Sequence, residues 1–317
     1  MVSVYAYFGP AGTFTEMALD TLLRRRGAEA AATKLPVSNP PAVIESIRCG
    51  DADFGCVPIE SSLEGAVPAT MDALVPRGDQ TRVQAYAEVA LDIAFTVAAA
   101  APLDPADVRT VAAYPVAAGQ VRRSIEERFP NAEIVVSTSN SGAARDVSQG
   151  NADAAVTTAA AARMYGLTAL AEGVADSDDA VTRFLLLGRP GVPPEPTGAD
   201  RTSVVLDLPN APGSLVAAMN EFAMRGIDLT RIESRPRAAD PAHGDRGSGQ
   251  YRFYLDARGH VRDAAVGEAL RALHRTAERV VFLGSWAIDP RLTVTAAATP
   301  DHESSREWFE HLLLGDI

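Results

Sequence analysis

The hydrophobic pattern of the first 188 residues alternates between two periods. Short apolar runs, such as those that begin near Val4 and Thr110, have the length of buried strands, and stretches with apolar residues at helical spacing separate them. Strands that alternate with amphipathic helices are typical of βα units and of a largely parallel sheet. We therefore predict an α/β domain over residues 1–188.

A weak internal repeat, offset by about one hundred residues, divides this region into two. The segment from Ser38, SNPPAVIESIRCGDADFGCVPIE, aligns with one gap with the segment from Ser139, SNSGAARDVSQGNADAAVTTAA. Each reads as a Ser-Asn cap, an amphipathic helix, a terminating glycine (Gly50 or Gly150) and a buried strand. Either such units recur by chance in an alanine-rich α/β protein, or two βαβαβ lobes bind a ligand between them, and we expect the second.

The pattern breaks at residues 189–200, RPGVPPEPTGAD, where four prolines and two glycines predict a linker between two separable units. The predicted elements that follow are strand 203–208, helix 213–224, strand 228–235, strand 250–257, helix 262–275 and strand 278–285. This βαββαβ order over residues 201–288 is the ferredoxin-like arrangement, an antiparallel sheet with both helices on one face. In the tail, residues 289–317, SREWFEHLLL predicts a short amphipathic helix for packing or an interface.

Composition and charge narrow the classes of partner. Apolar residues make up 47% and charged residues 22%, the balance of a globular protein. The net charge of -12 argues against nucleic acid or an anionic membrane as partner. No apolar run is long enough for a bilayer, and the opening VSVYAYFGPAG lacks the pattern of a secretory signal, so we expect a cytosolic protein.

The positions of the cysteine, lysine and histidine residues limit the reactions that this chain can catalyse. The spacing of Cys49 and Cys56 allows a disulfide, but a cytosolic location favours a reduced, buried pair. Lys34 is the only lysine and hence the only anchor for Schiff-base or pyridoxal chemistry. All five histidines lie beyond residue 240, so a site in the first 200 residues excludes histidine-dependent nucleophiles and histidine-bound metals unless the C-terminal part reaches it.

Three segments gather polar residues where strands meet helices or loops. In the first, YFGPAGTFTEMAL, a strand leads through a Gly-Pro-Ala-Gly loop into a helix, and Thr13 and Glu16 have the spacing of a capping box. The free amides at this helix start favour a ligand carboxylate, with Thr13 and Thr15 as added donors. A purely structural cap explains the same residues.

The second segment, VPIESSLEGAVPATMDAL, leaves a strand at Pro58 and enters a helix near Val67. Between them lies a polar loop with Glu60, Ser61, Ser62, Glu64 and Gly65. Its hydroxyls and carboxyls suit a polar ligand or a proton relay, although a solvated loop has the same composition. Because the loop follows a strand of the first repeat, we place it at the cleft between the lobes.

The third segment, DSDDAVTRFLLLGR, begins the last strand before the linker. Side chains alternate along a strand, so Thr182 and Phe184 share one face and Arg183 points to the other unless the backbone bulges. An arginine at the start of an apolar strand is also typical of a structural ion pair, since a buried charge needs a partner.

Together these motifs resemble the prephenate dehydratase family over residues 4 to about 288. FGPAGTFTE, VPIESSLEGAV, AAARMYGLTALAEGVADSDDAVTRF and RIESRPR occur in the family's order. The resemblance implies a two-lobed catalytic domain of the type II periplasmic-binding-protein kind, followed by an ACT regulatory domain. It also implies the decarboxylative dehydration of prephenate to phenylpyruvate without a cofactor. Ser61 and Ala180 stand where relatives have asparagine, and Tyr114 where they have histidine, so arogenate is an alternative substrate and a non-catalytic ligand sensor an alternative function.

The resemblance also implies roles for the site residues. Thr182 is placed at the leaving hydroxyl as a hydrogen-bond donor, with the proton delivered by Glu64, Glu60 or water. Arg183 either holds a substrate carboxylate or fixes the cleft, and Phe184 forms an apolar wall. Substrate-binding positions are Thr13, Thr15, Glu60, Ser61, Ser62 and Gly65.

The effector motifs of the family lie in the second unit. Those residues that match the Gly-Ala-Leu-Val motif and its loop are Asn210, Ala211, Gly213, Ser214, Leu215 and Val216, with Ser214 in place of alanine. Those that match ESRP are Glu233, Ser234, Arg235 and Pro236. The resemblance implies that phenylalanine binds between paired ACT domains of a homo-oligomer, a dimer of dimers. Alternatively, ESRP only ends a strand, with Arg235 paired to nearby carboxylates and Pro236 stopping the ladder.

Overall fold

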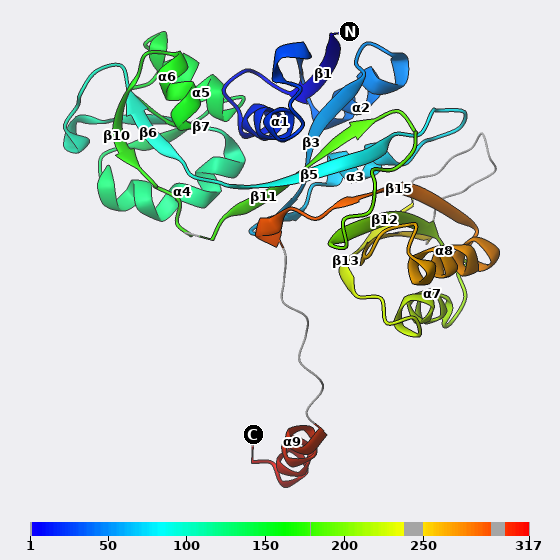
Figure 1. Cartoon of the computed structure of the whole chain (residues 1–317). Helices are drawn as coiled ribbons and strands as arrows, with labels where there is room; N and C mark the ends of the chain where they lie inside the picture. Colours follow the sequence, from blue (N-terminus) through cyan, green and yellow to red (C-terminus); the bar gives the residue numbers. More distant parts are fainter. Residues whose placement is uncertain (1, 178, 238–249, 293–301, 317) are drawn as a thin grey trace.

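The structure is a computed structural model that describes residues 2–177, 179–237, 250–292 and 302–316. Two α/β lobes and a C-terminal unit pack together, and a terminal helix follows (Figure 1). We call the lobes lobe 1 and lobe 2 in the order in which the chain enters them. The C-terminal unit comprises residues 200–287.

Lobe 1 is built around five strands in the order β2-β1-β3-β11-β5, with the short β4 paired to β3. Its elements are β1 (Ser3–Phe8), α1 (Phe14–Arg25), β2 (Ala32–Val37), α2 (Pro40–Cys49), β3 (Phe54–Ser61), β4 (Gly65–Ala66), α3 (Pro68–Leu74), β5 (Gln84–Asp92) and β11 (Val181–Gly188). Strands β1, β2 and β3 are parallel, and β11 runs antiparallel to both β3 and β5. The strand that carries Thr182, β11, therefore lies between β3 and β5 in the sheet of this lobe.

Lobe 2 repeats this plan in the order β8-β7-β9-β6-β10. Its elements are β6 (Thr96–Ala99), β7 (Thr110–Ala113), α4 (Pro115–Arg128), β8 (Glu133–Val136), α5 (Asn140–Ser148), β9 (Ala154–Thr157), α6 (Ala159–Met164) and β10 (Thr168–Glu172). The chain crosses between the lobes twice, from β5 to β6 and from β10 to β11. The predicted pair of βαβαβ units is confirmed, and the fold is the two-lobed, type II periplasmic-binding-protein arrangement.

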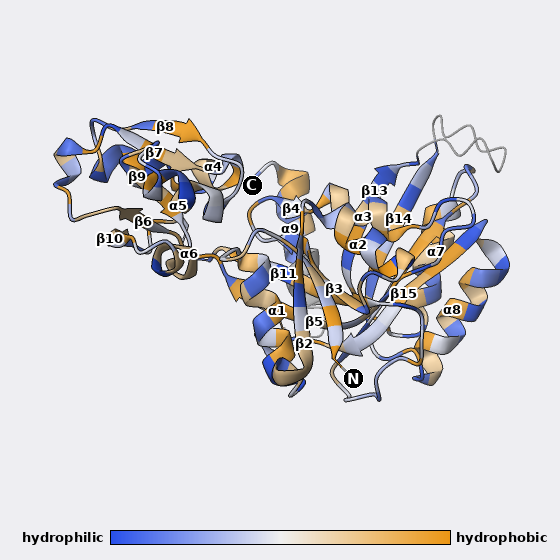
Figure 2. Cartoon of the chain, turned by 90° about the horizontal axis from the view of Figure 1, so that it is seen from above, coloured by the Kyte–Doolittle hydropathy of each residue, from blue (hydrophilic) through white to orange (hydrophobic). Residues whose placement is uncertain are grey.

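The C-terminal unit has the predicted βαββαβ order. Its elements are β12 (Asp200–Asp207), α7 (Ser214–Ala223), β13 (Leu229–Pro236), β14 (Tyr251–Arg258), α8 (Ala264–Thr276) and β15 (Arg279–Ala287). The strands form an antiparallel sheet in the order β13-β14-β12-β15, and both helices lie on one face of it (Figure 1). Figure 2 shows hydrophobic and hydrophilic stretches on α7 and α8, as expected of helices with one buried face.

The C-terminal unit and lobe 1 share one sheet and one core. Gly284 of β15 pairs with Ala85 of β5, which joins the strands of both parts into a ten-stranded sheet. One apolar cluster also crosses the boundary, because Trp286 and Val205 pack with Val43 and other lobe 1 residues. Residues 190–199 contain no helix or strand, in keeping with the predicted linker, but the units that they connect are in extensive contact.

The junction leaves no room for a side chain at Gly284. Its φ is +142°, and a Cβ there would lie 2.3 Å from the carbonyl oxygen of Ala85. We expect Gly284→Ala to lower the free energy of unfolding by about 1–3 kcal/mol, because backbone atoms must move apart to admit the methyl group. Gly119→Ala is the matched control, since a Cβ on this exposed residue of α4 meets nothing within 4 Å. Equal denaturant midpoints for both variants would contradict the close approach of the two strands.

The C-terminal tail agrees with the sequence-based expectation where it is described. Helix α9 (His302–Leu314) confirms the predicted terminal helix, and its Trp308 and Phe309 are exposed, while residues 293–301 of the tail lie outside the described residues. Within the described ranges, no helix has the length and apolar character to cross a membrane.

The two cysteines are unbonded, and Cys56 is buried. Cys49 is exposed, because it ends α2 next to solvent. The prediction of a buried pair is therefore wrong for Cys49.

Candidate active site

A cleft of about 740 Å³ lies between the two lobes. Its polar lining comes from both sides: Thr13, Thr15, Ser38, Asn39, Ser61, Glu64 and Thr182 of lobe 1, and Tyr114, Gln120, Thr138, Ser139 and Asn140 of lobe 2. Its apolar lining includes Phe8, Phe14, Ile93, Phe95 and Phe184. The described lining contains one carboxylate and no arginine, lysine or histidine. An anionic ligand must therefore be bound by hydroxyls, amides and helix starts.

The structure brings most of the predicted site residues to this cleft, but not all of them. Thr13, Thr15, Ser61, Glu64, Gly65, Thr182 and Phe184 line it. Glu60, Ser62 and Arg183 do not, so Arg183 is not in position to hold a substrate carboxylate in the cleft. The predicted alternation along β11 is confirmed, because Thr182 and Phe184 face the cleft while Arg183 points to the other side of the sheet.

The loop after β3 is tied to the start of β11. Ser62 Oγ donates to the carbonyl of Asp179 at 3.1 Å and accepts from the amide of Val181 at 3.0 Å. In the sheet, Thr182 stands directly opposite Ser61, and side chains in such pairs are close neighbours. Ser61 Oγ accepts from the amide of Glu64 at 3.4 Å, which helps to hold that residue beside the cleft. Ser62 thus acts through the backbone, as an anchor of the loop.

The hydroxyl of Thr182 is available for a ligand. Among the described residues, neither this hydroxyl nor the carboxylate of Glu64 has a hydrogen-bond partner in the protein. Thr182 is half-buried and Glu64 is exposed at the cleft. The site therefore offers one free donor hydroxyl on a strand and one free carboxylate on the adjoining loop.

The hydroxyl of Thr13, in contrast, is engaged in capping α1, although the predicted capping box is only half formed, because the Glu16 carboxylate binds the amide of Gly12 and not that of Thr13. Thr13 Oγ1 donates to the carbonyl of Phe8 at 3.2 Å and accepts from the amide of Glu16 at 3.4 Å. Glu16 Oε2 in turn accepts from the amide of Gly12 at 2.7 Å. Thr13 positions the start of α1, which leaves Thr15 as the freer of the two predicted donors.

The Gly-Pro-Ala-Gly loop also joins the lobes. Ser141 Oγ donates to the carbonyl of Ala11 at 2.5 Å, and Thr158 Oγ1 donates to the carbonyl of Gly12 at 2.6 Å. Gly12 has a φ of +85°, and a Cβ there would lie 3.0 Å from the side chain of Ala161. Close approach of the two lobes at this loop therefore requires glycine.

Sequence reasoning missed the contribution of lobe 2, although the repeat held the signal. Asn39 caps α2 by accepting from the amide of Ala42, and Ser139 caps α5 by accepting from the amide of Gly142. The two Ser-Asn pairs, at equivalent places in the repeat, face the cleft from opposite lobes. Had the repeat been used to transfer site positions, Ser38, Asn39, Ser139 and Asn140 would have been found.

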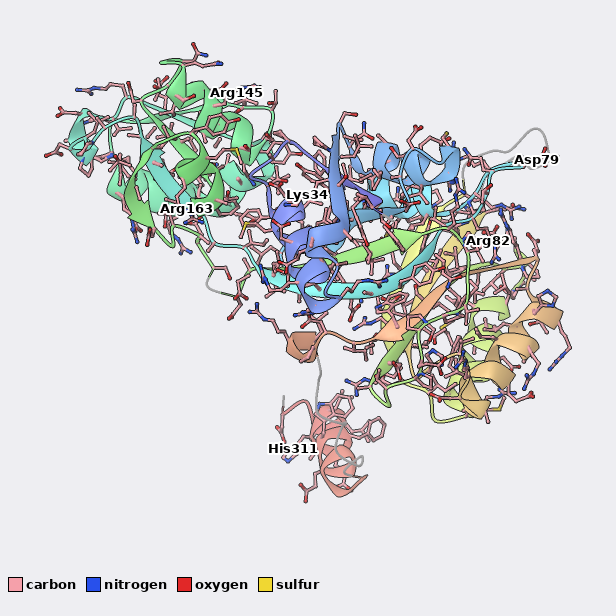
Figure 3. The ribbon with its side chains drawn as sticks, turned by 45° about the horizontal axis from the view of Figure 1, so that its top comes forward. Lys34, Asp79, Arg82, Arg145, Arg163 and His311 are labelled. Carbon is pink, nitrogen blue, oxygen red and sulfur yellow. The ribbon has the colours of Figure 1, made fainter. Side chains whose placement is uncertain are left out.

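Neither Lys34 nor any histidine is among the described residues that line the cleft. Lys34 Nζ pairs with Glu16 at 3.2 Å and with Asp20 at 2.5 Å, and the residue does not line the cleft, so pyridoxal chemistry has no anchor there. Figure 3 shows Lys34 on lobe 1, well separated from Arg145 and Arg163 of lobe 2 and from His311 of α9. In the part of the chain that the structure describes, no group of three or more His, Cys, Asp or Glu side chains is arranged to bind a metal.

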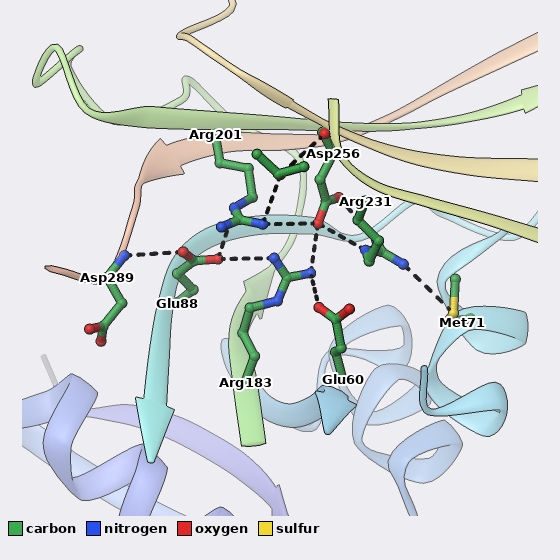
Figure 4. Close-up of polar contacts among 9 residues, drawn as sticks. Glu60, Met71, Glu88, Arg183, Arg201, Arg231, Asp256 and Asp289 are labelled. Carbon is green, nitrogen blue, oxygen red and sulfur yellow. Dashed lines mark hydrogen bonds and ion pairs between the residues drawn. The ribbon is translucent and has the colours of Figure 1, made fainter. Parts of the chain in front are cut away.

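Arg183 lies in a buried ion cluster between lobe 1 and the C-terminal unit (Figure 4). Its Nη2 donates to Asp256 Oδ2 of β14 at 2.6 Å and is 3.4 Å from Glu60 Oε2, while its Nη1 is 3.6 Å from Glu88 Oε2. Arg201 and Arg231 contribute further contacts to Asp256. The alternative of a structural ion pair therefore describes Arg183 better than substrate binding does.

The ion cluster around Arg183 keeps the carboxylate of Asp256 charged. Burial alone would raise the pKa of Asp256, but the guanidinium groups of Arg231, Arg183 and Arg201 hold it well below its ordinary value. Burial likewise would lower the pKa of Arg183, which Asp256, Glu88 and Glu60 raise instead. A depressed carboxyl pKa stabilises the folded state above the carboxyl's unfolded pKa, and this stability is lost only as the pH falls through the folded value. Asp256 and Arg183 therefore stay charged at neutral pH.

The two segments that resemble the family's effector motifs lie at the same end of the C-terminal sheet. Asp207, at the end of β12, and Arg235 of ESRP both pair with Arg252 in the strand register. Gly213 precedes α7 with a φ of +83° and no side chain caps this helix, while Leu215 and Val216 are exposed. Arg235 makes two 2.8 Å hydrogen bonds to the carboxylate of Asp72 in α3. The alternative in which Arg235 pairs with a nearby carboxylate is therefore present in this structure.

Comparison with known proteins shows which family the chain is similar to. The prephenate dehydratase family model matches residues 5–192. A prephenate dehydratase of Mycolicibacterium gilvum is 50% identical over 316 residues, which cover 98% of each chain. The crystal structure of a prephenate dehydratase from Arthrobacter aurescens in complex with L-Phe superimposes with a TM-score of 0.82 at 36% identity, covering 98% of this chain and 100% of that one.

One similar structure has a different description. GqqA, described as a novel type of quorum quenching acylase, has a TM-score of 0.75 and 27% identity, and the match covers 92% of this chain and 100% of that chain. A shared fold does not fix a reaction, so the family is taken from the full-length sequence relatives and the family model together. On both grounds, this chain belongs to the prephenate dehydratase family.

Proposed function

We propose that this chain converts prephenate to phenylpyruvate, with loss of carbon dioxide and water, and that Thr182 is its central catalytic residue. One observation carries the assignment of the site: the free hydroxyl of Thr182 projects into a cleft with hydroxyls, helix starts and aromatic walls but no described cationic side chain. The reaction needs a donor at a leaving hydroxyl and a site shaped for a dicarboxylate with an apolar ring. It needs no nucleophile.

The chemistry follows from aromatisation. The bond between the ring and its carboxylate breaks, the electron pair enters the ring, and the hydroxyl at the opposite ring carbon leaves. Thr182 donates a hydrogen bond to that hydroxyl, and Glu64 or water supplies the proton that completes the departing water. Glu60 is no longer a candidate because it faces Arg183 instead of the cleft. Phe184 and its aromatic neighbours keep bulk water from the ring, which strengthens the donor's effect.

The helix starts around the cleft account for the charge of the substrate. Helices α1, α2, α4 and α5 all begin at the cleft, and their first residues contribute to its lining. Amides and positive dipole ends at such termini favour carboxylates. Two lobes related by a repeat offer comparable groups to the two carboxylates of prephenate.

An activity assay tests the reaction. We expect the purified full-length chain, with no added metal or nucleotide and with a chelator present, to form phenylpyruvate from prephenate, followed by the product's absorbance. Arogenate, supplied at the same concentration, is expected to react more slowly, because among the described lining residues an ammonium in place of the keto group has only Glu64 as a carboxylate partner. A folded sample that forms no phenylpyruvate would overturn the proposal.

We infer that the C-terminal unit is an ACT regulatory domain through which phenylalanine controls the enzyme. The βαββαβ topology, the uncapped start of α7 and the position of ESRP at the same end of the sheet support this role. Phenylalanine then binds between paired units of two chains, which makes the enzyme a homo-oligomer, assembled as a dimer of dimers. We also place it in the cytosol, in keeping with its unbonded cysteines.

Two other functions have less support. An acylase of the kind named for GqqA requires an activated nucleophile, yet the described cleft residues include no cysteine, lysine or histidine that would serve as nucleophile or base. A pure sensor of ligands would bind prephenate in the cleft without turning it over. The assay above separates both from the proposed reaction.

A further inference from the structure

Strand β11 carries two neighbouring residues that face different parts of the protein. Thr182 faces the cleft, and Arg183 faces the C-terminal unit. Arg183 is only 4% exposed, so neighbouring carboxylates must stabilise its charge in place of water. Among the described residues, its one side-chain hydrogen bond goes to Asp256, and its Nε and Nη1 have no hydrogen-bond partner.

The strand ladder is irregular at this point. Arg183 pairs with Glu60 and Phe184 pairs with Pro58, so Ile59 of β3 is passed over between them. A bulge of this kind interrupts the ladder hydrogen bonds and bends the strand locally. On its other edge, β11 pairs with β5 without a shift from Val181 to Leu186, so the irregularity is confined to the pairing with β3, where Ser61 stands opposite Thr182.

Side-chain contacts compensate for this irregularity. The guanidinium of Arg183 reaches carboxylates on three other strands: Glu60 on β3, Glu88 on β5 and Asp256 on β14 (Figure 4). Asp256 is itself fixed, because Arg231 holds it with two hydrogen bonds of 2.9 Å. The shortest of the three contacts to Arg183 thus comes from the C-terminal unit and from a carboxylate that cannot easily move.

We propose that Arg183 is a positioning residue whose contact with Asp256 of the C-terminal unit fixes strand β11 so that the Thr182 hydroxyl points into the cleft. The inference rests on the proposed role of Thr182. It makes the C-terminal unit part of the catalytic geometry, because any shift of β14 moves Asp256 and with it the start of β11. The unit then influences turnover directly, whether or not an effector is bound.

Two matched substitutions test the proposal. Arg183→Lys keeps the charge, but a single ammonium cannot contact three carboxylates as a planar guanidinium does. Arg252→Lys removes a guanidinium from another buried carboxylate of the same unit, Asp207, which Arg252 binds with hydrogen bonds of 2.7 and 3.0 Å. Among the described residues, the Arg252 side chain contacts neither Asp256 nor the cleft lining. We expect Arg183→Lys to lower kcat about fivefold with KM within about twofold of the parent, because misplacement of a reacting group affects the transition state most. Arg252→Lys is expected to lose similar thermal stability with kcat within about twofold of the parent.

A second variant covers the case in which Arg183→Lys does not fold. Asp256→Glu keeps every charge and displaces the carboxylate by one methylene, and it is expected to lower kcat in the same direction. Hydrogen exchange of the peptide over residues 180–186, measured by mass spectrometry, supplies a readout that needs no activity. We expect faster exchange there in Arg183→Lys and Asp256→Glu than in Arg252→Lys.

The outcomes separate this inference from the assignment of the reaction. If Arg252→Lys lowers kcat as much as Arg183→Lys, or if neither Arg183→Lys nor Asp256→Glu changes kcat or exchange, the positioning role is wrong. If the parent chain forms no phenylpyruvate, the proposed reaction is wrong, and the exchange measurement still decides whether Asp256 fixes β11.

Discussion

Replacement of Thr182 with alanine is expected to lower kcat by about a hundredfold or more, because the change removes a donor aimed at the departing hydroxyl. The interaction strengthens as negative charge develops on that oxygen, so the loss falls on kcat more than on KM. Stability is expected to change little, since the Thr182 hydroxyl has no protein hydrogen-bond partner among the described residues and the side chain is half-buried. Steady-state kinetics and thermal unfolding measure the two effects.

Thr182→Ser is the matched control. It keeps the hydroxyl and removes one methyl group, so we expect it to retain much more of the parent's turnover. If Thr182→Ala keeps near-normal kcat, the role given to this hydroxyl is wrong, and Glu64→Gln becomes the variant to measure. If alanine and serine are equally slow, the methyl group, and thus the packing of the cleft wall, matters more than the donor.

Much of the fold could be predicted from local pattern because each element satisfies its own rules. Capping boxes, glycine terminators and strand periodicity located both βαβαβ lobes and the whole βαββαβ unit. The alternation of Thr182, Arg183 and Phe184 was also correct, since β11 is a regular strand over these residues and the bulge lies in β3. These features depend on residues close together in the sequence.

The rest depended on contacts between distant residues, which a single sequence does not reveal. Arg183 finds its partner 73 positions away, at Asp256, and Ser141 meets Ala11 across 130 positions. Nothing near Arg183 shows whether its carboxylate partner belongs to a substrate or to another strand. The glycine at 284 was likewise unremarkable until the backbone of Ala85 was placed against it.

The proposed coupling between the effector site and the cleft also depends on contacts between residues that are distant in the sequence. Helix α3 lies between the C-terminal unit and the cleft. Its first residues, Pro68 and Ala69, line the cleft. Farther along, Tyr254 Oη donates to the carbonyl of Met71 at 3.0 Å, and Arg235 of ESRP binds Asp72 with two hydrogen bonds. A movement of β13 or β14 on binding of an effector would therefore act on a helix of seven residues whose other end forms the cleft wall.

Asp72→Asn is expected to leave phenylalanine binding nearly intact while raising the phenylalanine concentration needed for half-inhibition on the order of tenfold. The variant breaks the charged contact between ESRP and α3, and coupling free energies of about 1–3 kcal/mol between sites correspond to changes of this size. An exposed ion pair contributes little stability, so the variant is expected to fold. Calorimetric titration with phenylalanine and inhibition curves with prephenate measure binding and coupling separately.

Asp79→Asn is the matched control, because it removes a carboxylate from an exposed residue of the same lobe that, among the described residues, makes no ion pair or hydrogen bond with the C-terminal unit. Arg235→Ala differs from both, since it removes a residue of the effector motif itself and is expected to weaken binding as well as inhibition. This difference distinguishes a residue that binds phenylalanine from one that transmits its effect. If Asp72→Asn is inhibited as the parent is, the Arg235–Asp72 contact only stabilises the end of β13, and the effect of phenylalanine must reach the cleft through Asp256 and Arg183.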